Sequence, residues 1–150
     1  MLGPREIRFY GQKGDHKCFS NFSPHPIEID GVEWPTVEHY YQAQKFAGTT
    51  QERLIQMASS PKEAKRLGGS RTWPLRPDWE SVKDDVMRRA VRRKFETHED
   101  ARISLIFTGN AAIIEALPWD YYWGEGRSGK GKNKLGQILM EVRDELRKKE

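Results

Sequence analysis

The chain has 150 residues, of which 36% are hydrophobic and 32% are charged, and it carries a formal net charge of +4. This length fits one domain with a core of its own, and no apolar run approaches the ~20 residues that a membrane-spanning helix needs. The single cysteine, Cys18, excludes an internal disulfide, and the N-terminus lacks the apolar core of a signal peptide, so we expect a cytoplasmic protein.

The first elements along the chain are predicted to be short strands. Ile7–Tyr10 combines β-branched and aromatic residues, which favour a strand. Apolar and polar residues alternate over Ile27–Asp30, and Val32–Trp34 follows after one glycine. Because Asp30-Gly31 is typical of a hairpin turn, these two segments are predicted to pair as an antiparallel hairpin.

The stretch Trp34–Phe46, with the sequence WPTVEHYYQAQKF, is predicted to form a helix that begins after Thr36. The Thr36 hydroxyl can accept a hydrogen bond from an N–H group of the first turn, which places Glu38 and His39 in that turn. Two interpretations of Glu38 follow. It is either a first-turn acid that stabilises the helix by about 0.3–1 kcal/mol, or a catalytic carboxylate fixed on a rigid element among aromatic rings.

Most of the remaining chain is predicted to be helical. Ser60-Pro61-Lys62-Glu63 has the spacing of a capping box with proline at the first helical position. The predicted helices are Gln51–Ala58, a segment from Ser60 to the glycines Gly68 and Gly69, Asp78–Glu96, Arg102–Phe107, Ala111–Leu117 and Lys134–Lys148. We therefore expect a mostly helical α+β single domain over residues 1–150, with a small antiparallel sheet near the N-terminus and without the βαβ alternation of a Rossmann fold.

The long predicted helix starts with an aromatic residue and has a basic side. Trp79, at its start, either stacks on a base or packs in the core. The basic side is either a solvated face, with Asp84, Asp85 and Glu96 nearby, or a surface that contacts nucleic-acid phosphates. Its basic residues are Arg88, Arg89, Arg92, Arg93 and Lys94.

A second informative stretch is Asp120–Gly136, DYYWGEGRSGKGKNKLG, in which glycines and basic residues precede a predicted helix. Glycines let backbone N–H groups approach an anion, lysines add positive charge, and the helix start adds its dipole, so this stretch is a candidate phosphate site. It lacks the GxxxxGK[ST] pattern of a Walker P-loop, and the alternative is a flexible, solvated loop. The residues concerned are Gly124, Gly126, Gly129, Lys130, Gly131 and Lys132.

Two polar residues flank this loop, and each has two interpretations. Asp120 lies among four aromatic residues and is either a turn residue or a site residue. Asn133 either caps the last helix or contacts a sugar hydroxyl or phosphate. The sequence has no cluster of histidine and cysteine residues at metal-ligand spacing, and His39 has no partner histidine, so no metal site is predicted.

In several blocks along nearly the whole chain, the sequence resembles the NADAR family, and in particular its YbiA-like N-glycosidases. The most specific block is WPTVEHYYQAQKF, which matches the family signature WPT-x-EH-x-x-QAQKF. The other blocks are FSNFSP at Phe19–Pro24, SSPKEAKRLG at Ser59–Gly68, RPDWESVKDDVMRRAVRRKF at Arg76–Phe95 and DYYWGEGRSGKGKNKLGQILMEVR at Asp120–Arg143.

This resemblance implies an enzyme that hydrolyses an N-glycosidic bond at C1 of a ribose and needs no cofactor. Departure of the amine or base leaves positive charge at C1. A carboxylate can stabilise this charge, or the carboxylate can activate a water molecule. We therefore expect Glu38 and Asp120 to be the catalytic pair. The expected substrate-binding residues are Asn21, Trp34, His39, Tyr41, Trp79, Trp123 and Asn133, together with the glycines and lysines of the loop between Gly124 and Lys132.

The resemblance leaves two substrate classes open. YbiA-like members act on phosphorylated N-ribosides, the early pyrimidine intermediates of riboflavin synthesis, and release ribose 5-phosphate. Other members remove ADP-ribose from guanine in DNA. Similarity along the whole of this single-domain chain favours the riboflavin intermediates, which are small-molecule partners. An alternative of another class is a non-catalytic module that binds ADP-ribose or a nucleotide.

Overall fold

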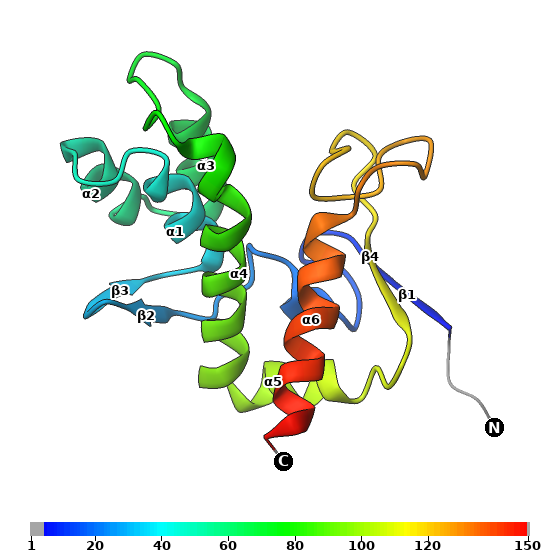
Figure 1. The fold of residues 1–150 in the computed structure, drawn as a ribbon. Helices are drawn as coiled ribbons and strands as arrows, with labels where there is room; N and C mark the ends of the chain where they lie inside the picture. Colours follow the sequence, from blue (N-terminus) through cyan, green and yellow to red (C-terminus); the bar gives the residue numbers. More distant parts are fainter. Residues whose placement is uncertain (1–4, 150) are drawn as a thin grey trace. The chain divides into compact units, whose positions relative to one another are not determined.

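The computed structural model describes residues 5–149. Within these residues the chain forms six α-helices, one short 3-10 helix and four short strands (Figure 1). The chain divides into two compact units: a central unit, Pro24–Lys94, and a terminal unit that combines the chain up to Ser23 with the chain from Phe95 onwards. None of the helices in the described part of the chain is both long and apolar enough to cross a membrane.

The central unit begins with a hairpin of two antiparallel strands, β2 (Ile27–Ile29) and β3 (Val32–Trp34). The turn residues Asp30 and Gly31 both have positive φ angles, 54° and 80°. This left-handed backbone is what a two-residue Asp-Gly turn requires, because its twist matches the twist of the flanking strands. The predicted hairpin is therefore confirmed.

Three short helices follow and pack against one another: α1 (Val37–Gln44), α2 (Thr50–Gln56) and α3 (Pro61–Gly69) (Figure 1). The predicted cap of α1 forms, because the Thr36 hydroxyl accepts a hydrogen bond from the His39 N–H at 3.1 Å. The capping serine before α3 makes the corresponding 3.1 Å bond. The long helix α4 (Trp79–Thr97) starts in this unit.

The terminal unit contains a parallel pair of strands, β1 (Glu6–Phe9) and β4 (Ala112–Glu115). The helix predicted over Ala111–Leu117 is therefore wrong. The β-branched residues Ile113 and Ile114 lie in a strand that pairs with a segment at the other end of the sequence. Local periodicity could not reveal this pairing, because a short apolar run fits a helix or a strand equally well.

The C-terminal helix α6 (Lys134–Lys148) packs against β4 and α5 (Glu99–Ile106) within the terminal unit (Figure 1). The 3-10 helix η1 (Lys17–Phe19) also contacts α5. One side of α6 is apolar and buried, with Leu135, Ile138, Leu139, Val142 and Leu146. The mostly helical α+β fold with a small antiparallel sheet is thus confirmed, and the parallel pair is an addition to it.

Candidate active site

Glu38 lies in the first turn of α1 and is only 6% exposed. Four positions along the same helix, the Gln42 Nε2 donates a hydrogen bond to the Glu38 Oε2 at 2.6 Å. Hydrogen bonds to ionised groups are about twice as strong as bonds between neutral groups, and they fix the orientation of both partners. The central unit therefore presents a buried carboxylate whose direction is set by a neighbouring amide.

Lys45 is a second buried ionisable residue that the sequence analysis missed. It follows α1 directly and is 9% exposed; its Nζ lies 3.4 Å from the Gly68 carbonyl oxygen and 5.6 Å from the centre of the Tyr41 ring. Burial and, to a smaller extent, the nearby cation Arg71 together lower the pKa of Lys45 to about 8, while the charge of Glu38 opposes this. The sequence feature that could have pointed to Lys45 is its seven-residue spacing from Glu38, because this spacing places both residues on one side of a helix.

The aromatic residues of the central unit pack on one another. The rings of Tyr41 and Trp79 lie 5.2 Å apart at 58°, and both side chains are buried. Trp34 meets Tyr40 edge to face at 5.4 Å and is also buried. For Trp79, this geometry favours core packing over stacking on a base, because its ring is already covered.

His39 is engaged on both sides of its ring. Its Nδ1 lies 2.8 Å from the Thr36 hydroxyl, and its Nε2 lies 3.0 Å from the Ala58 carbonyl oxygen. Burial lowers the pKa of His39, which favours a neutral ring that donates one hydrogen bond and accepts the other. These contacts tie the start of α1 to the segment that follows α2, and they favour a structural role for His39 over the predicted substrate contact.

Asp120 belongs to the terminal unit and organises a tight turn. Its Oδ1 accepts hydrogen bonds from the N–H groups of Tyr122 at 3.0 Å and Trp123 at 2.8 Å. Aspartate side chains commonly stabilise turns in this way. The Tyr122 and Trp123 rings lie edge to face at 4.9 Å. The turn interpretation of Asp120 thus has direct support, and Asn21 and Trp123 lie half-buried in the same unit.

Several backbone N–H groups of the glycine–lysine loop and of the start of α6 are already paired within the protein. The N–H groups of Lys132, Lys134 and Leu135 donate to the carbonyl oxygens of the aromatic segment, Tyr121–Trp123, at 2.8–3.1 Å. The first two N–H groups of α6 are therefore already paired with protein carbonyls. The side chains of Lys130 and Lys132 are exposed.

The loop glycines allow two segments of backbone to approach closely. A Cβ on Gly131 would lie 2.6 Å from the Gly124 carbonyl oxygen and 2.6 Å from the Glu125 carbonyl carbon, closer than real Cβ atoms approach. Gly126 and Gly129 have φ angles of 69° and 76°, a conformation that favours glycine. These glycines are required by the fold of the loop itself, whether or not an anion binds there.

Of the two interpretations of Asn133, the structure does not support the one in which its side chain caps α6. Its φ angle is 52°, and its side chain makes no capping hydrogen bond. Instead the Asn133 Oδ1 accepts a hydrogen bond from the Glu115 N–H, and its Nδ2 donates one to the Ile113 carbonyl oxygen, both at 2.9 Å. The amide thus binds the backbone of β4 as another strand would, which leaves it poorly suited to a sugar.

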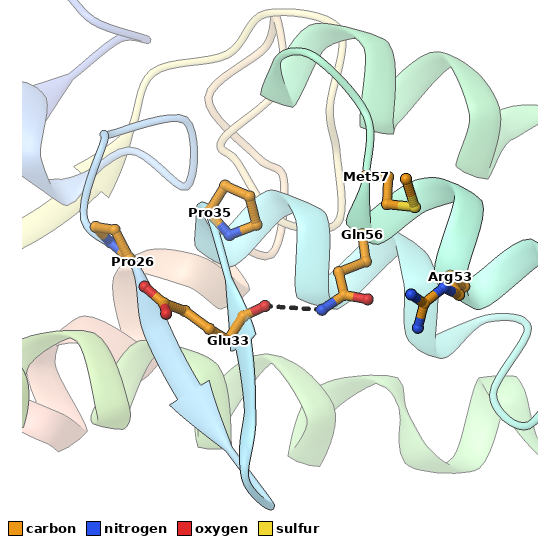
Figure 2. Close-up of a pocket in the computed structure, with 6 residues that line it drawn as sticks. All are labelled: Pro26, Glu33, Pro35, Arg53, Gln56 and Met57. Atoms are coloured by element: carbon orange, nitrogen blue, oxygen red, sulfur yellow. Dashed lines mark hydrogen bonds between the residues drawn. The ribbon is translucent and has the colours of Figure 1, made fainter.

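The central unit also has an open groove. Its cavity volume is about 550 Å³, and Gln56 bridges its walls by donating a hydrogen bond to the Glu33 carbonyl oxygen at 3.0 Å (Figure 2). Met57, on its rim, is 69% exposed. The lining residues are Pro26, Glu33, Pro35, Arg53, Gln56 and Met57. None of them was predicted to bind substrate.

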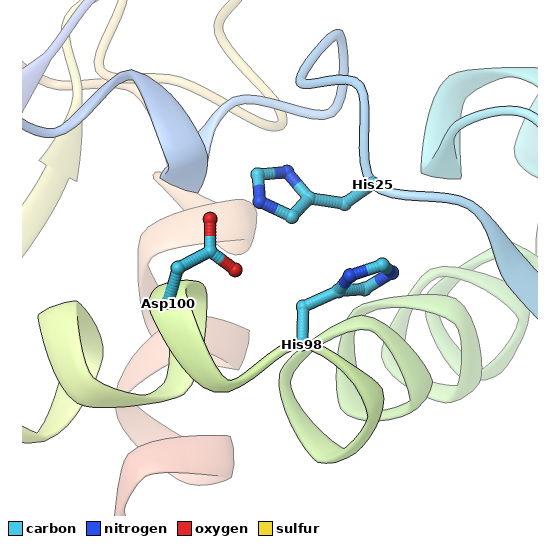
Figure 3. Close-up of side chains that lie close together, drawn as sticks. All are labelled: His25, His98 and Asp100. Carbon is cyan, nitrogen blue, oxygen red and sulfur yellow. The ribbon is translucent and has the colours of Figure 1, made fainter.

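His98 and Asp100 are the histidine and carboxylate at the start of α5 in the terminal unit (Figure 3). One ligand-type atom of each lies within 4.8 Å of the other. His25, also drawn there, belongs to the central unit. Within the terminal unit this pair supplies two ligands, whereas protein zinc sites use three or four.

We expect the activity to survive exhaustive chelation with EDTA, because a carboxylate and a lysine can supply the acid–base chemistry without a metal. The measurement is turnover of the same protein sample before and after dialysis against the chelator. Loss of activity that one added metal restores would contradict this expectation.

The chain is similar to known proteins along nearly its whole length. The family model of the NADAR domain matches residues 8–147. N-glycosidase YbiA of Escherichia coli is 50% identical over 140 residues, which cover 93% of this chain and 88% of that protein. N-glycosidase Npun_R5314 of Nostoc punctiforme is 48% identical, covering 94% of this chain and 92% of that protein.

Two further similarities bear on fold and substrate. The chloroplastic riboflavin biosynthesis protein PYRR of Zea mays is 44% identical over 93% of this chain, which matches 25% of that longer protein. The NMR structure of YbiA from E. coli has a TM-score of 0.89 and 47% identity, over 99% of this chain and 89% of that one. The chain therefore belongs to the NADAR family, among its YbiA-like N-glycosidases.

Proposed function

We propose that this N-glycosidase hydrolyses phosphorylated N-ribosides, that its substrates are early pyrimidine intermediates of riboflavin biosynthesis, and that it releases ribose 5-phosphate. The observation that carries the proposal is the buried Glu38 carboxylate, fixed by Gln42 at 2.6 Å on a helix that bears the family signature. The similarity to a riboflavin biosynthesis protein of Zea mays supports the substrate class.

The proposed reaction needs a negatively charged side chain beside C1 of the ribose. As the bond to nitrogen breaks, positive charge develops on C1 and the ring oxygen, and an adjacent carboxylate stabilises it or directs a water molecule to C1. We assign this role to Glu38, because its rigid position costs no reorganisation during the reaction. Asp120 is the second proposed carboxylate and would act through Oδ2, since its Oδ1 already binds two backbone N–H groups.

The departing amine or base also needs a proton. We assign the proton donor to Lys45, because a pKa of about 8 lets it carry a proton at neutral pH and still release it readily. A lysine exposed to solvent, with a pKa near 10.4, is a much weaker acid. Lys45 would thus complete the acid and base pair that Glu38 alone does not provide.

The phosphate of the riboside is proposed to contact Lys130 and Lys132. Substituting both by alanine should raise KM by about two- to thirty-fold, because contacts at exposed ammonium groups contribute about 0.2–1 kcal/mol each. The measurement is KM for a phosphorylated riboside and for the same riboside without phosphate, and the loss should be larger for the first. An equal loss for both substrates would move the phosphate site elsewhere.

The basic side of α4 argues against DNA as the main substrate. Arg88 pairs with Asp85 at 2.6 Å, and Arg89 pairs with Asp30 at 2.7 Å. Lys94 is 1% exposed. Because their charges are paired or covered, these residues are poorly placed to contact a string of phosphates, and the solvated-face interpretation is favoured.

We therefore expect the small phosphorylated riboside to have a higher kcat/KM than ADP-ribosylated guanine in DNA. A DNA substrate releases counterions on binding, so its affinity should fall with salt with a slope near −0.9 per phosphate contacted, whereas a riboside with one phosphate should show a shallow slope. The measurement is kcat/KM for both substrates across a salt series, with ribose 5-phosphate detected directly. Preference for the DNA adduct at physiological salt, or saturable binding without any product, would contradict the proposed function.

A further inference from the structure

The side chain of Gln42 is unusual because only one half of its amide is satisfied. The residue is 4% exposed, and its Nε2 donates the 2.6 Å hydrogen bond to Glu38. Its Oε1 is buried and has no hydrogen-bond partner among the described residues. Protein structures rarely leave a buried acceptor unpaired, because the group has lost its hydrogen bonds to water.

Gly68 of α3 lies directly against this amide. A Cβ on Gly68 would overlap the Gln42 Oε1 and would lie 2.7 Å from its Cδ and 2.8 Å from its Cβ. The next residue, Gly69, would have no atom within 4 Å of its Cβ. The two glycines end the same helix, so only the first is needed for close contact between α3 and Gln42.

These contacts restrict the amide from two directions. Gly68 covers the oxygen side, and the Glu38 carboxylate accepts from the nitrogen side. If the amide served stability alone, an apolar side chain of similar size would fill the space without an unpaired oxygen. What an apolar side chain cannot do is donate a hydrogen bond to a buried carboxylate.

We propose that Gln42, confined by Gly68, is a positioning residue that keeps Glu38 ionised and correctly oriented for the hydrolysis. This inference rests on the proposed function, because it assigns Gln42 a role through Glu38. A donor bonded to a carboxylate favours the ionised form over the acid, and burial opposes it. Loss of the donor should therefore make the working carboxylate easier to protonate.

Other charged residues of the central unit also act on the charges of Glu38 and Lys45. The cations that lower the pKa of Lys45 come from α3, from the loop after it and from α4. The acid on α2, Glu52, instead accepts hydrogen bonds from the Gln44 Nε2 at the end of α1, at 2.9 Å, and from the Gly48 N–H in the following turn, at 3.1 Å. The cations are Lys65, Arg71 and Lys83, in addition to Lys45 itself.

The first test is the pH dependence of kcat/KM in Gln42→Met, which keeps the side-chain volume and removes the donor. The acidic limb of the profile should move to higher pH by about one to two units, while the denaturant midpoint stays close to wild type. A merely structural role predicts the reverse: a lower midpoint and an unmoved acidic limb. That result would overturn the proposal.

The second test is a cycle with Gly68→Ala, with Gly69→Ala as its matched control. Gly68→Ala should displace the amide and shift the acidic limb in the same direction, whereas Gly69→Ala should leave the profile unchanged. In the Gln42→Met background, Gly68→Ala should add no further shift, because both changes act on one contact. Fully additive shifts would show that Gly68 does not act through Gln42.

Failure of the proposed function is distinguishable from failure of this inference. If the wild-type protein releases no ribose 5-phosphate from any riboside, the proposed function fails. If the wild type is active and Glu38→Gln is not, but Gln42→Met keeps the wild-type acidic limb, the inference alone fails.

Discussion

Glu38→Gln is expected to lower kcat by about 10²–10⁴-fold, because a neutral amide can neither stabilise positive charge at C1 nor activate water. The side chain keeps its size, and its new carbonyl oxygen can still accept the hydrogen bond from Gln42. Folding should therefore be retained. The measurement is single-turnover release of ribose 5-phosphate, together with the denaturant midpoint of the same preparation.

The chain offers a matched control for this substitution in Glu63. It too is an acid in the first turn of a short helix, α3, but it is more exposed and pairs with Arg66. If first-turn acids matter only through the helix dipole, Glu38→Gln and Glu63→Gln should have similar, small effects. Wild-type turnover in a folded Glu38→Gln protein would refute the catalytic role of Glu38.

The elements that the sequence predicted well are those with a local cause. The α1 start follows from the Thr36 hydroxyl, and the hairpin follows from Asp30-Gly31, whose φ angles need only those two residues. The strand β4 (Ala112–Glu115) was missed because its partner lies at the other end of the chain. Composition can suggest a strand there, but only the distant pairing decides it.

In the candidate site, too, features with a local cause could be predicted and features that depend on distant segments could not. The Glu38 position could be predicted, because it depends on the start of one helix. The sequence could not show that the N–H groups near α6 are already paired with carbonyls of Tyr121–Trp123. Nor could it show that Asn133 binds β4, since both contacts join segments that meet only in the folded unit.

Lys45 was likewise missed, although it lies inside the most specific sequence block. A lysine in a polar stretch is normally exposed, and only the packing of the central unit shows that its ammonium group is buried beside the Gly68 carbonyl. Its unusual acidity is a property of that environment. This makes Lys45 the residue for which the structure changes the functional expectation most.

Lys45→Met is expected to lower kcat by about 10²–10⁴-fold for substrates that lose a basic amine, because the departing nitrogen then has no proton donor. The loss should shrink for a riboside whose leaving group is weakly basic, since that group departs without a proton. The measurement is kcat for a series of leaving groups in the variant and in the wild type. A loss of the same size across the series would refute the donor role.

The pH dependence gives an independent check. Because the pKa of Lys45 is about 8, wild-type activity should fall as the pH rises through 8, when the donor loses its proton. Arg71→Gln removes the cation that lowers the pKa of Lys45 most, so this variant should keep turnover and move the alkaline limb to higher pH.

Stability should respond to pH with a definite sign. The pKa of Lys45 is lower in the folded chain than the ordinary lysine value of 10.5, so between pH 8 and 10.5 the unfolded chain binds more protons. The free energy of unfolding should therefore rise with pH across this window in the wild type, and Lys45→Met should lack that rise. A variant that loses activity while gaining or keeping stability at neutral pH would show that the buried ammonium is retained for chemistry. Equal pH dependence of unfolding in both proteins would instead mean that Lys45 titrates as an ordinary exposed lysine and cannot be the proton donor.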